Sequence, residues 1–163
     1  MADSLTQAVD KILWPFLQQE GFVQRTSRKF VRERNDVFQQ IVIDANGAGG
    51  KSRTVVMLFA SLPFGPVGGY LDPHGFLLGS GRRWRMETAD VAQKSMTQIV
   101  EALRRHELEK LDGLSDLPAM IESLRPLTHR SWHATYADLY SRWRASDAEV
   151  VAIHQSNRAT LGL

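Results

Sequence analysis

Residues 22–62 contain a succession of segments with the sequence pattern of β-strands, and this stretch constrains the fold more than any other. The segments are apolar or alternate between apolar and polar residues, and they span residues 22–25, 28–34, 37–45 and 54–62. Strands joined by short turns pair in antiparallel orientation, so the pattern predicts an antiparallel β-meander. A sheet has to bury at least one face, and helices from the rest of the chain are needed to cover it.

The last two segments differ in the number of apolar faces that they offer. In residues 37–45, Val37, Ile41 and Ile43 share one face at a period of two. Residues 55–59 are apolar throughout, which is typical of a central strand that is covered on both faces. We therefore predict a core that contains Phe30, Ile41, Ile43, Met57 and Leu58.

Both ends of the chain have helical periodicity. An apolar face recurs through residues 5–17, and Pro15 is expected to kink or split this helix because proline lacks a backbone N–H. A long helix is predicted from residue 90 to 111, with a buried stripe formed by Met96, Ile99, Val100 and Leu103. A later helix face is largely aromatic and comprises Trp132, Tyr136, Leu139, Tyr140 and Trp143.

With 163 residues, the chain has the length of one domain. We predict a single α+β domain over residues 1–163, built from an antiparallel sheet with an N-terminal helix and a C-terminal helical layer. Its parts are a helix at 1–20, a β-meander at 22–62, a glycine- and proline-rich loop with a short strand at 63–88, and helices at 90–163. Within the third part, residues 63–81 are expected to form an exposed loop.

The composition excludes several classes of protein. The chain has no cysteine, which excludes disulfide bonds, zinc–thiolate sites and iron–sulfur clusters. No apolar run approaches the roughly 20 residues that cross a bilayer, and the first residues lack the basic flank and apolar core of a secretory signal. We therefore predict a soluble, cytoplasmic protein without a membrane partner.

Several short motifs resemble those of a bacterial family of domains of unknown function. In that family a leucine-rich helix with a proline leads to a Gly-Phe pair, an aromatic–x–arginine strand follows, and the next strand carries a glutamine. The corresponding residues are 12–17, Gly21-Phe22, Phe30 with Arg32, and Gln40 to Ile43. Where the family commonly has Gln-Lys-Ser, this chain has Ile43-Asp44-Ala45. The resemblance implies the fold and a helper or antitoxin-like role, as found among small domains encoded beside effector genes.

Residues 45–52 fit a relaxed phosphate-loop pattern that ends in Gly50-Lys51-Ser52. A phosphate loop has to be followed by a helix whose N-terminus faces the phosphates. The residues that follow, 53–56, are largely β-branched and predict a strand instead. We therefore interpret residues 46–52 as a connection between two strands, and we predict no cofactor.

Two pairs of residues have spacings that could support chemistry. His129 and His133 are four residues apart, a spacing that can hold a metal ion on one helix face, and Asp72 with His74 could form an acid–base pair. No third metal ligand, nucleophile or second carboxylate is evident beside either pair. We therefore predict no metal site and no catalytic residue, and a small hydrolase built around residues 63–81 stays open as a third interpretation.

Two groups of arginines remain as candidates for a binding site. The first group shares a strand face with Phe30 and comprises Arg28, Arg32 and Arg34. The second group surrounds Trp84 and comprises Arg82, Arg83 and Arg85. Arginines mixed with aromatic side chains bind phosphates and stack on bases, whereas arginines on an edge strand oppose aggregation. Because Phe30 belongs to the predicted core, only Trp84 would be free to stack on a base.

These observations favour a binding protein over an enzyme. We predict a non-enzymatic bacterial protein that binds a macromolecular partner, most simply another protein. The alternative is a nucleic-acid-binding module that uses both arginine groups, for which we expect weak or absent binding. Self-association into a homo-oligomer also stays open.

Overall fold

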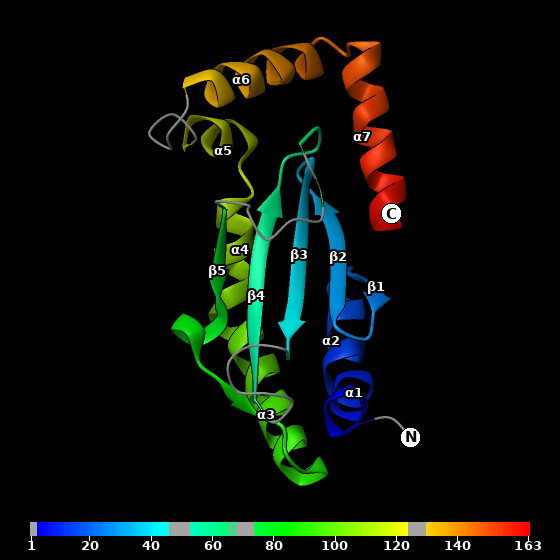
Figure 1. Cartoon of the computed structure of the whole chain (residues 1–163), viewed down its shortest axis with the longest axis vertical. Helices are drawn as coiled ribbons and strands as arrows, with labels where there is room; N and C mark the ends of the chain where they lie inside the picture. The colour runs from blue at the N-terminus through cyan, green and yellow to red at the C-terminus, as the bar shows by residue number, and fades with distance from the viewer. Residues whose placement is uncertain (1–2, 46–52, 66, 68–73, 124–129) are drawn as a thin grey trace.

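The structure is a computed structural model that describes residues 3–45, 53–65, 67, 74–123 and 130–163. These residues form an α+β fold with an antiparallel sheet, as predicted (Figure 1). The strands are β1 (Val23–Thr26), β2 (Lys29–Arg34), β3 (Val37–Asp44), β4 (Arg53–Ser61), β5 (Gly75–Leu77) and β6 (Trp84–Arg85). Their order is β1-β2-β3-β4-β5, and β6 pairs with the first residues of β4.

The N-terminal helix continues past Pro15 instead of splitting. It consists of α1 (Ser4–Ala8), the π-helical turn η1 (Val9–Leu13) and α2 (Trp14–Gln19). In a regular α-helix the ring of Pro15 would collide with the carbonyl group four residues earlier. The wider turn directly before it, in which the Trp14 N–H donates to the Val9 carbonyl, accommodates the proline without a break.

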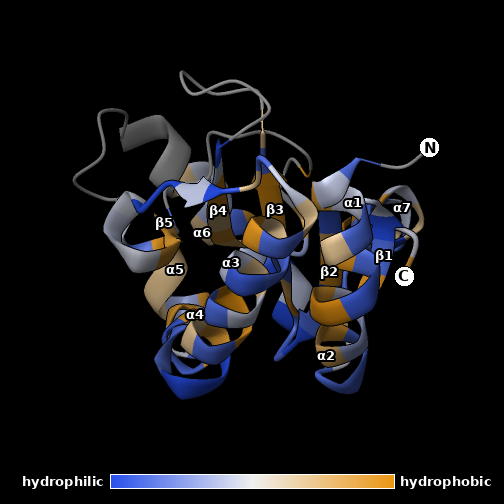
Figure 2. Cartoon of the chain, turned by 90° about the horizontal axis from the view of Figure 1, so that it is seen from below, coloured by the Kyte–Doolittle hydropathy of each residue, from blue (hydrophilic) through white to orange (hydrophobic). Residues whose placement is uncertain are grey.

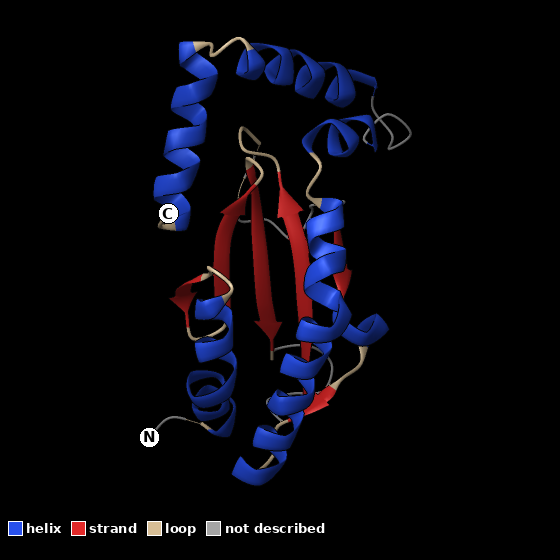
Figure 3. Cartoon of the chain, turned by 180° about the vertical axis from the view of Figure 1, so that it is seen from behind, coloured by secondary structure: helices blue, strands red, loops and turns tan. Residues whose placement is uncertain are grey.

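The predicted long helix is confirmed. It comprises α3 (Ala89–Ala102), a second π-helical turn η4 (Leu103–Glu107) and α4 (Leu108–Leu114), so it ends three residues later than expected. The four residues of its predicted stripe are all buried: Met96, Ile99, Val100 and Leu103. This helix and the N-terminal helix lie beside each other over the same face of the sheet (Figure 3).

The main core lies between these two helices and the sheet. Phe30, Ile41 and Leu58 are paired across β2, β3 and β4, point towards the helices and are fully buried. Figure 2 shows hydrophobic residues along β3, where the helices meet the sheet. The prediction that Met57 belongs to this core is wrong: Met57 points to the opposite face of the sheet and is only partly buried. A strand that is apolar on both faces does not reveal which face the helices cover.

The prediction of an exposed loop over residues 63–81 is wrong for residues 63–65, which are buried, and for β5, which extends the sheet. Residues 78–81 form the turn η3, in which Gly79 and Ser80 are exposed and have left-handed φ angles of 57° and 56°. Gly75 is needed where β5 meets β4, because a Cβ there would lie 2.9 Å from the Cβ of Phe59. Asp72 lies outside the described residues.

Three further helices complete the described chain: α5 (Leu117–Ser123), α6 (Arg130–Arg144) and α7 (Ala148–Leu161). α5 and α6 lie beyond the end of the sheet at which β4 ends, and α7 returns beside β2 (Figure 1). The predicted aromatic face of α6 packs on a second apolar cluster, which contains Val37, Leu62 and Phe64. Tyr136, Leu139, Tyr140 and Trp143 are partly buried there, and the side chain of Trp132 lies outside the described residues.

Glu33 on β2 anchors α7 to the sheet. Its carboxylate oxygens lie 2.8 Å from Nε2 of His154 and 2.5 Å from NH1 of Arg158. The His154 ring also stacks on Phe38, at 5.6 Å between centroids. Asn157 adds two hydrogen bonds, at 3.0 and 2.9 Å, from its side-chain amide to the carbonyl groups of residues 63 and 65.

We expect the substitution Glu33→Ala to loosen α7 more than the rest of the fold. The substitution leaves Arg158 and the buried His154 without their carboxylate, which costs about 1–3 kcal/mol of unfolding free energy. Hydrogen exchange measured by mass spectrometry should accelerate in α7 and much less in α3. Glu109→Ala, which removes an exposed carboxylate from α4, serves as the matched control. Equal acceleration in α3 and α7 would contradict this role of Glu33.

Candidate ligand-binding cleft

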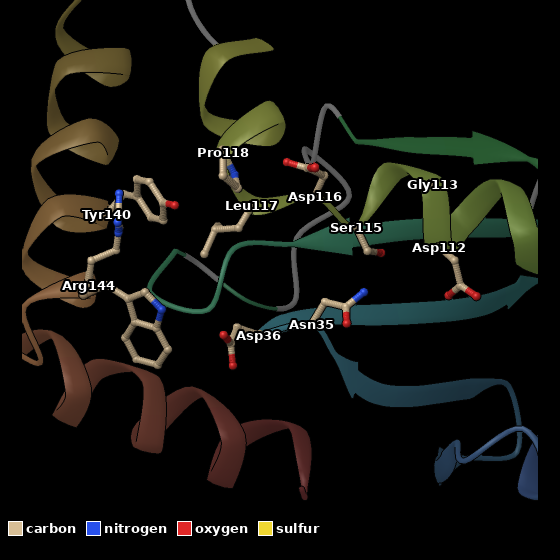
Figure 4. A pocket seen from close by; sticks show the side chains of 11 residues that line it. Asn35, Asp36, Asp112, Gly113, Ser115, Asp116, Leu117, Pro118, Tyr140 and Arg144 are labelled. Carbon is tan, nitrogen blue, oxygen red and sulfur yellow. The ribbon is translucent and has the colours of Figure 1, made fainter.

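A cleft of about 730 Å³ opens where the turn between β2 and β3, the corner between α4 and α5, and the helix α6 meet (Figure 4). Its volume lies in the range of about 300–1,000 Å³ that is usual for ligand sites. The charged groups that line it are three carboxylates and one guanidinium: Asp36, Asp112, Asp116 and Arg144. Tyr140 and Trp143 add two aromatic rings.

The turn between β2 and β3 places Asp36 at the cleft. Asn35 and Asp36 have φ angles of 53° and 62°, the left-handed values of a two-residue type I′ hairpin turn. Asparagine and aspartate tolerate this conformation better than other non-glycine residues, so the sequence suits the turn. The Asp36 side chain is exposed, and it forms no ion pair or hydrogen bond within the described part of the chain.

The corner between α4 and α5 places Asp112 and Asp116 on the neighbouring wall. The backbone N–H of Ser115 donates to the Asp112 carbonyl at 3.0 Å and closes the end of α4. The Asp116 carboxylate accepts from the backbone N–H of Ala119 at 2.9 Å, which caps the start of α5. One Asp116 oxygen therefore caps the helix, and the carboxylate forms no ion pair within the described part of the chain.

A buried polar network lies behind this wall and connects it to the sheet. Arg32 donates from Nε to Gln39 at 2.6 Å and from NH2 to Asp112 at 3.0 Å. The Gln39 amide donates to Asp112 at 2.9 Å and to the Ser115 hydroxyl at 2.6 Å. Arg34 contacts the second oxygen of Asp112 at 3.0 Å. Two guanidinium groups therefore pair with Asp112, whereas Asp36 and Asp116 have no cationic partner among the described residues.

Arg32 is the buried charge of the network, with 5% of its side chain exposed. Burial lowers the pKa of its guanidinium, and the neighbouring Asp112 carboxylate opposes this effect. The guanidinium also lies 4.4 Å from the centre of the Phe22 ring and donates to the Glu20 carbonyl at 2.5 Å. Because every side of the group is occupied, Arg32 supports the cleft and is not accessible to a ligand.

α6 forms the opposite wall. Tyr140 and Arg144 are one turn apart, and the Arg144 guanidinium carbon lies 5.9 Å from the centre of the Tyr140 ring. Trp143 is held by aromatic contacts with Phe64, at 6.3 Å, and His154, at 4.7 Å between ring centroids. Tyr140 and Arg144 lie across the cleft from Asp36 (Figure 4), and Trp143 also lines the cleft.

The two arginine groups from the sequence do not lie together. Arg32 and Arg34 bind Asp112, and Arg28 contacts Asp3 at 3.4 Å. Arg32 and Arg34 lie where β4 ends, and the second group lies at the other end of the sheet, where Arg85 pairs with Arg53 at the start of β4. The eight steps between the first and last residues of β4 separate these ends by about 27 Å, at about 3.4 Å per step. Arg28 lies between the two ends, because its carbonyl accepts from Ile43, which pairs with Val56. β1 pairs with residues 29–31 of β2 and leaves residues 32–34 without a strand on that side, but Arg32 is buried instead of exposed at this edge.

Trp84 is not free to stack on a base, contrary to the prediction. Only 4% of it is exposed, and the Arg82 guanidinium carbon lies 4.1 Å from the centre of its ring. The neighbouring Arg82, Arg83 and Arg85 are exposed. The second group therefore offers cations at the surface, but no accessible aromatic ring.

His74 has a geometry that argues against its action as a general base. Its Nε2 lies 3.0 Å from the Met120 carbonyl oxygen and 2.5 Å from the Ser123 hydroxyl. The carbonyl can only accept a hydrogen bond, so it favours the tautomer with the proton on Nε2. That nitrogen then cannot take a proton from Ser123, which itself donates to the Met120 carbonyl at 2.7 Å. The contacts join β5 to α5.

Several sequence-based interpretations lie partly or wholly outside the described residues. These include residues 46–52, His129 and the side chain of His133. The chain after residue 52 forms β4, the strand that the sequence predicted in place of a phosphate-loop helix. Within the described ranges, no group of three metal-ligating side chains could hold a metal ion. None of the described helices has the length and apolar character that crossing a membrane requires.

Comparison with known proteins adds no relative: no family model, curated protein or solved structure matches this chain. The interpretation of the cleft as a binding site therefore rests on its geometry alone. Sequence reasoning did not single out Asp36, Asp112, Asp116 or Arg144. Their turn and helix-end positions are visible in the sequence, but the fold alone brings residues some eighty positions apart into contact, as it does for Arg32 and Asp112.

Proposed function

We propose that this protein is a non-enzymatic binding protein whose cleft receives a positively charged side chain of a partner polypeptide. The observation that carries the proposal is a cleft of about 730 Å³ in which Asp36 and Asp116 have no cationic partner among the described residues. Tyr140 and Trp143 stand on the facing wall. Carboxylates together with aromatic rings are the groups that recognise an ammonium or guanidinium ion.

Arg144 makes a polypeptide a better candidate than a small free cation. It adds a positive charge to the otherwise acidic lining, and this charge disfavours an isolated cation. A partner with an acidic or carbonyl group near its basic side chain would satisfy Arg144 as well. The resemblance to small bacterial domains with a helper or antitoxin-like role also favours a protein partner.

The nucleic-acid alternative has less support. A nucleic-acid module would need its cations on one surface and an accessible ring for stacking. Here the first group contacts acidic side chains, with Arg32 and Arg34 at the end of the sheet opposite the second group, and Trp84 is buried. We therefore expect weak or absent binding of oligonucleotides.

We expect a short peptide with one central arginine, flanked by glycine and serine and blocked at both ends, to bind the cleft. In ¹H–¹⁵N NMR spectra its addition should shift the backbone signals of Asp36 and Tyr140. Asp36→Asn should weaken the binding about fivefold, because it removes one exposed charge-assisted contact of about 1 kcal/mol. Asparagine tolerates the left-handed backbone of this position, so the turn is retained.

Two controls make this test specific. The same peptide with glutamine in place of arginine should produce no saturable shift. The variant Asp10→Asn removes an exposed carboxylate from η1 and should bind the arginine peptide as the unmodified protein does. Equal affinity of Asp36→Asn and Asp10→Asn for the arginine peptide, or equal shifts with the glutamine peptide, would refute the proposal.

A further inference from the structure

A second pocket, of about 190 Å³, lies between β6 and α3, away from the cleft. Arg82, Arg83 and Trp84 line it from the β6 side, and Lys94 and Ser95 line it from α3. The indole N–H of Trp84 is buried and has no hydrogen-bond partner in the described part of the chain. This nitrogen is closed to water, so a ligand in the pocket would contact other atoms of Trp84, and the indole N–H can only report on such a ligand.

The cations around the pocket differ in the contacts that they make. Arg85 forms an ion pair with Glu87 at 2.8 Å, and Arg82 donates to the Gln98 side chain at 3.1 Å. Arg83 and Lys94 are exposed, and neither forms an ion pair with any residue that the structure describes. The pocket therefore combines the nine-tenths-buried Ser95 hydroxyl, which has no hydrogen-bond partner among the described residues, with two cations that have no counter-charge.

We propose that this pocket binds a phosphate-type oxyanion carried by a small molecule. The Ser95 hydroxyl would donate a hydrogen bond to the oxyanion, and Arg83 and Lys94 would supply the opposite charge. Ser95 is 9% exposed and lines the pocket from the helix side. The site is separate from the cleft and does not depend on the function proposed for it.

The dimensions of the site favour a single small group over a nucleic-acid backbone. The volume of about 190 Å³ lies below the range of about 300–1,000 Å³ of sites that enclose a whole drug-sized ligand. The buried ring of Trp84 cannot stack on a base. Arg32 and Arg34, at the far end of the sheet, cannot contact the same short strand of phosphates.

The test follows the Trp84 indole N–H by NMR during titration with inorganic phosphate and with glycerol phosphate, both at constant ionic strength. The resonance is assigned as the one of the four tryptophan indole signals that is missing in Trp84→Phe. We expect a saturable shift in the millimolar range with both phosphates and none with chloride. Absence of a saturable phosphate shift, or an equal response to chloride, would overturn the proposal.

Exposed variants provide the second part of the test. Arg83→Gln and Lys94→Gln should each weaken phosphate binding about threefold, the effect of one exposed charge pair. Arg105→Gln, which removes an exposed charge farther along the same helical run, should leave the affinity unchanged. Unchanged affinity in the first two variants would overturn the proposal. A single-stranded oligonucleotide that binds more than about tenfold more tightly than inorganic phosphate, per phosphate group, would overturn the proposal in favour of a nucleic-acid site.

Discussion

Replacement of Leu58 by alanine is expected to lower the free energy of unfolding by about 2–5 kcal/mol. Leu58 is fully buried and pairs with Ile41 on one side and Phe76 on the other, under the two covering helices. Truncation removes apolar contacts and leaves a cavity that a central strand cannot close by moving, because both of its neighbours are hydrogen-bonded to it. Chemical denaturation with urea measures the loss directly.

Met57→Ala is the matched control for this experiment. The two residues are adjacent and of similar size, but Met57 points to the face of the sheet away from the helices and is partly exposed. We expect Met57→Ala to cost less than half of the loss seen for Leu58→Ala, since part of the methionine surface already contacts water. Equal losses would mean that the sheet buries both faces to the same extent, and the assignment of the main core would be wrong.

The second large effect is expected from Asp112→Ala, which should destabilise the protein by about 3 kcal/mol. Removal of one partner of a buried ion pair usually costs about 3–5 kcal/mol, because the other charge stays buried without compensation. The Asp112 side chain is 31% exposed, so water screens the pair in part and the lower end of that range applies. Arg32, with 5% exposure, is the charge that would be left behind.

The double variant Arg32→Met, Asp112→Ala separates this cause from a simple loss of packing. With both charges removed, no uncompensated ion remains, so the double variant should be more stable than Asp112→Ala alone. Arg34→Ala, which removes the half-exposed second partner of Asp112, should cost less than about 1 kcal/mol. A double variant that is less stable than Asp112→Ala would show that the buried charge is not the source of the loss.

These stability measurements bear on the cleft as well. Asp112 and Ser115 belong both to the cleft lining and to the network that connects it with Arg32 and Gln39. The network holds the corner between α4 and α5 against the sheet, opposite the aromatic wall of α6. Variants of the network should therefore alter the shape of the cleft, whereas Asp36→Asn should alter only its charge.

Local patterns in the sequence determined most of the secondary structure. Apolar residues recur at a period of two in β3 and at helical spacing in α3. Each spacing follows from the backbone geometry of a strand or a helix, so it can be recognised in the sequence. The antiparallel meander followed from the short turns, because a turn such as Asn35-Asp36 leaves no room for a crossover connection. The α+β fold and nearly all of the predicted core were accessible in this way.

The tertiary structure alone decided which partner each polar or two-faced residue has. Arg32 and Trp84 were predicted as surface groups, but Arg32 meets Asp112 eighty residues later, and Trp84 is covered by Arg82 and α3. Met57 differs from Leu58 only through the choice of the face that the helices cover. A charge or a ring is stable either in water or beside a suitable partner, and local sequence does not distinguish the two. Only the packing of distant segments creates the partner, and with it the cleft and the pocket.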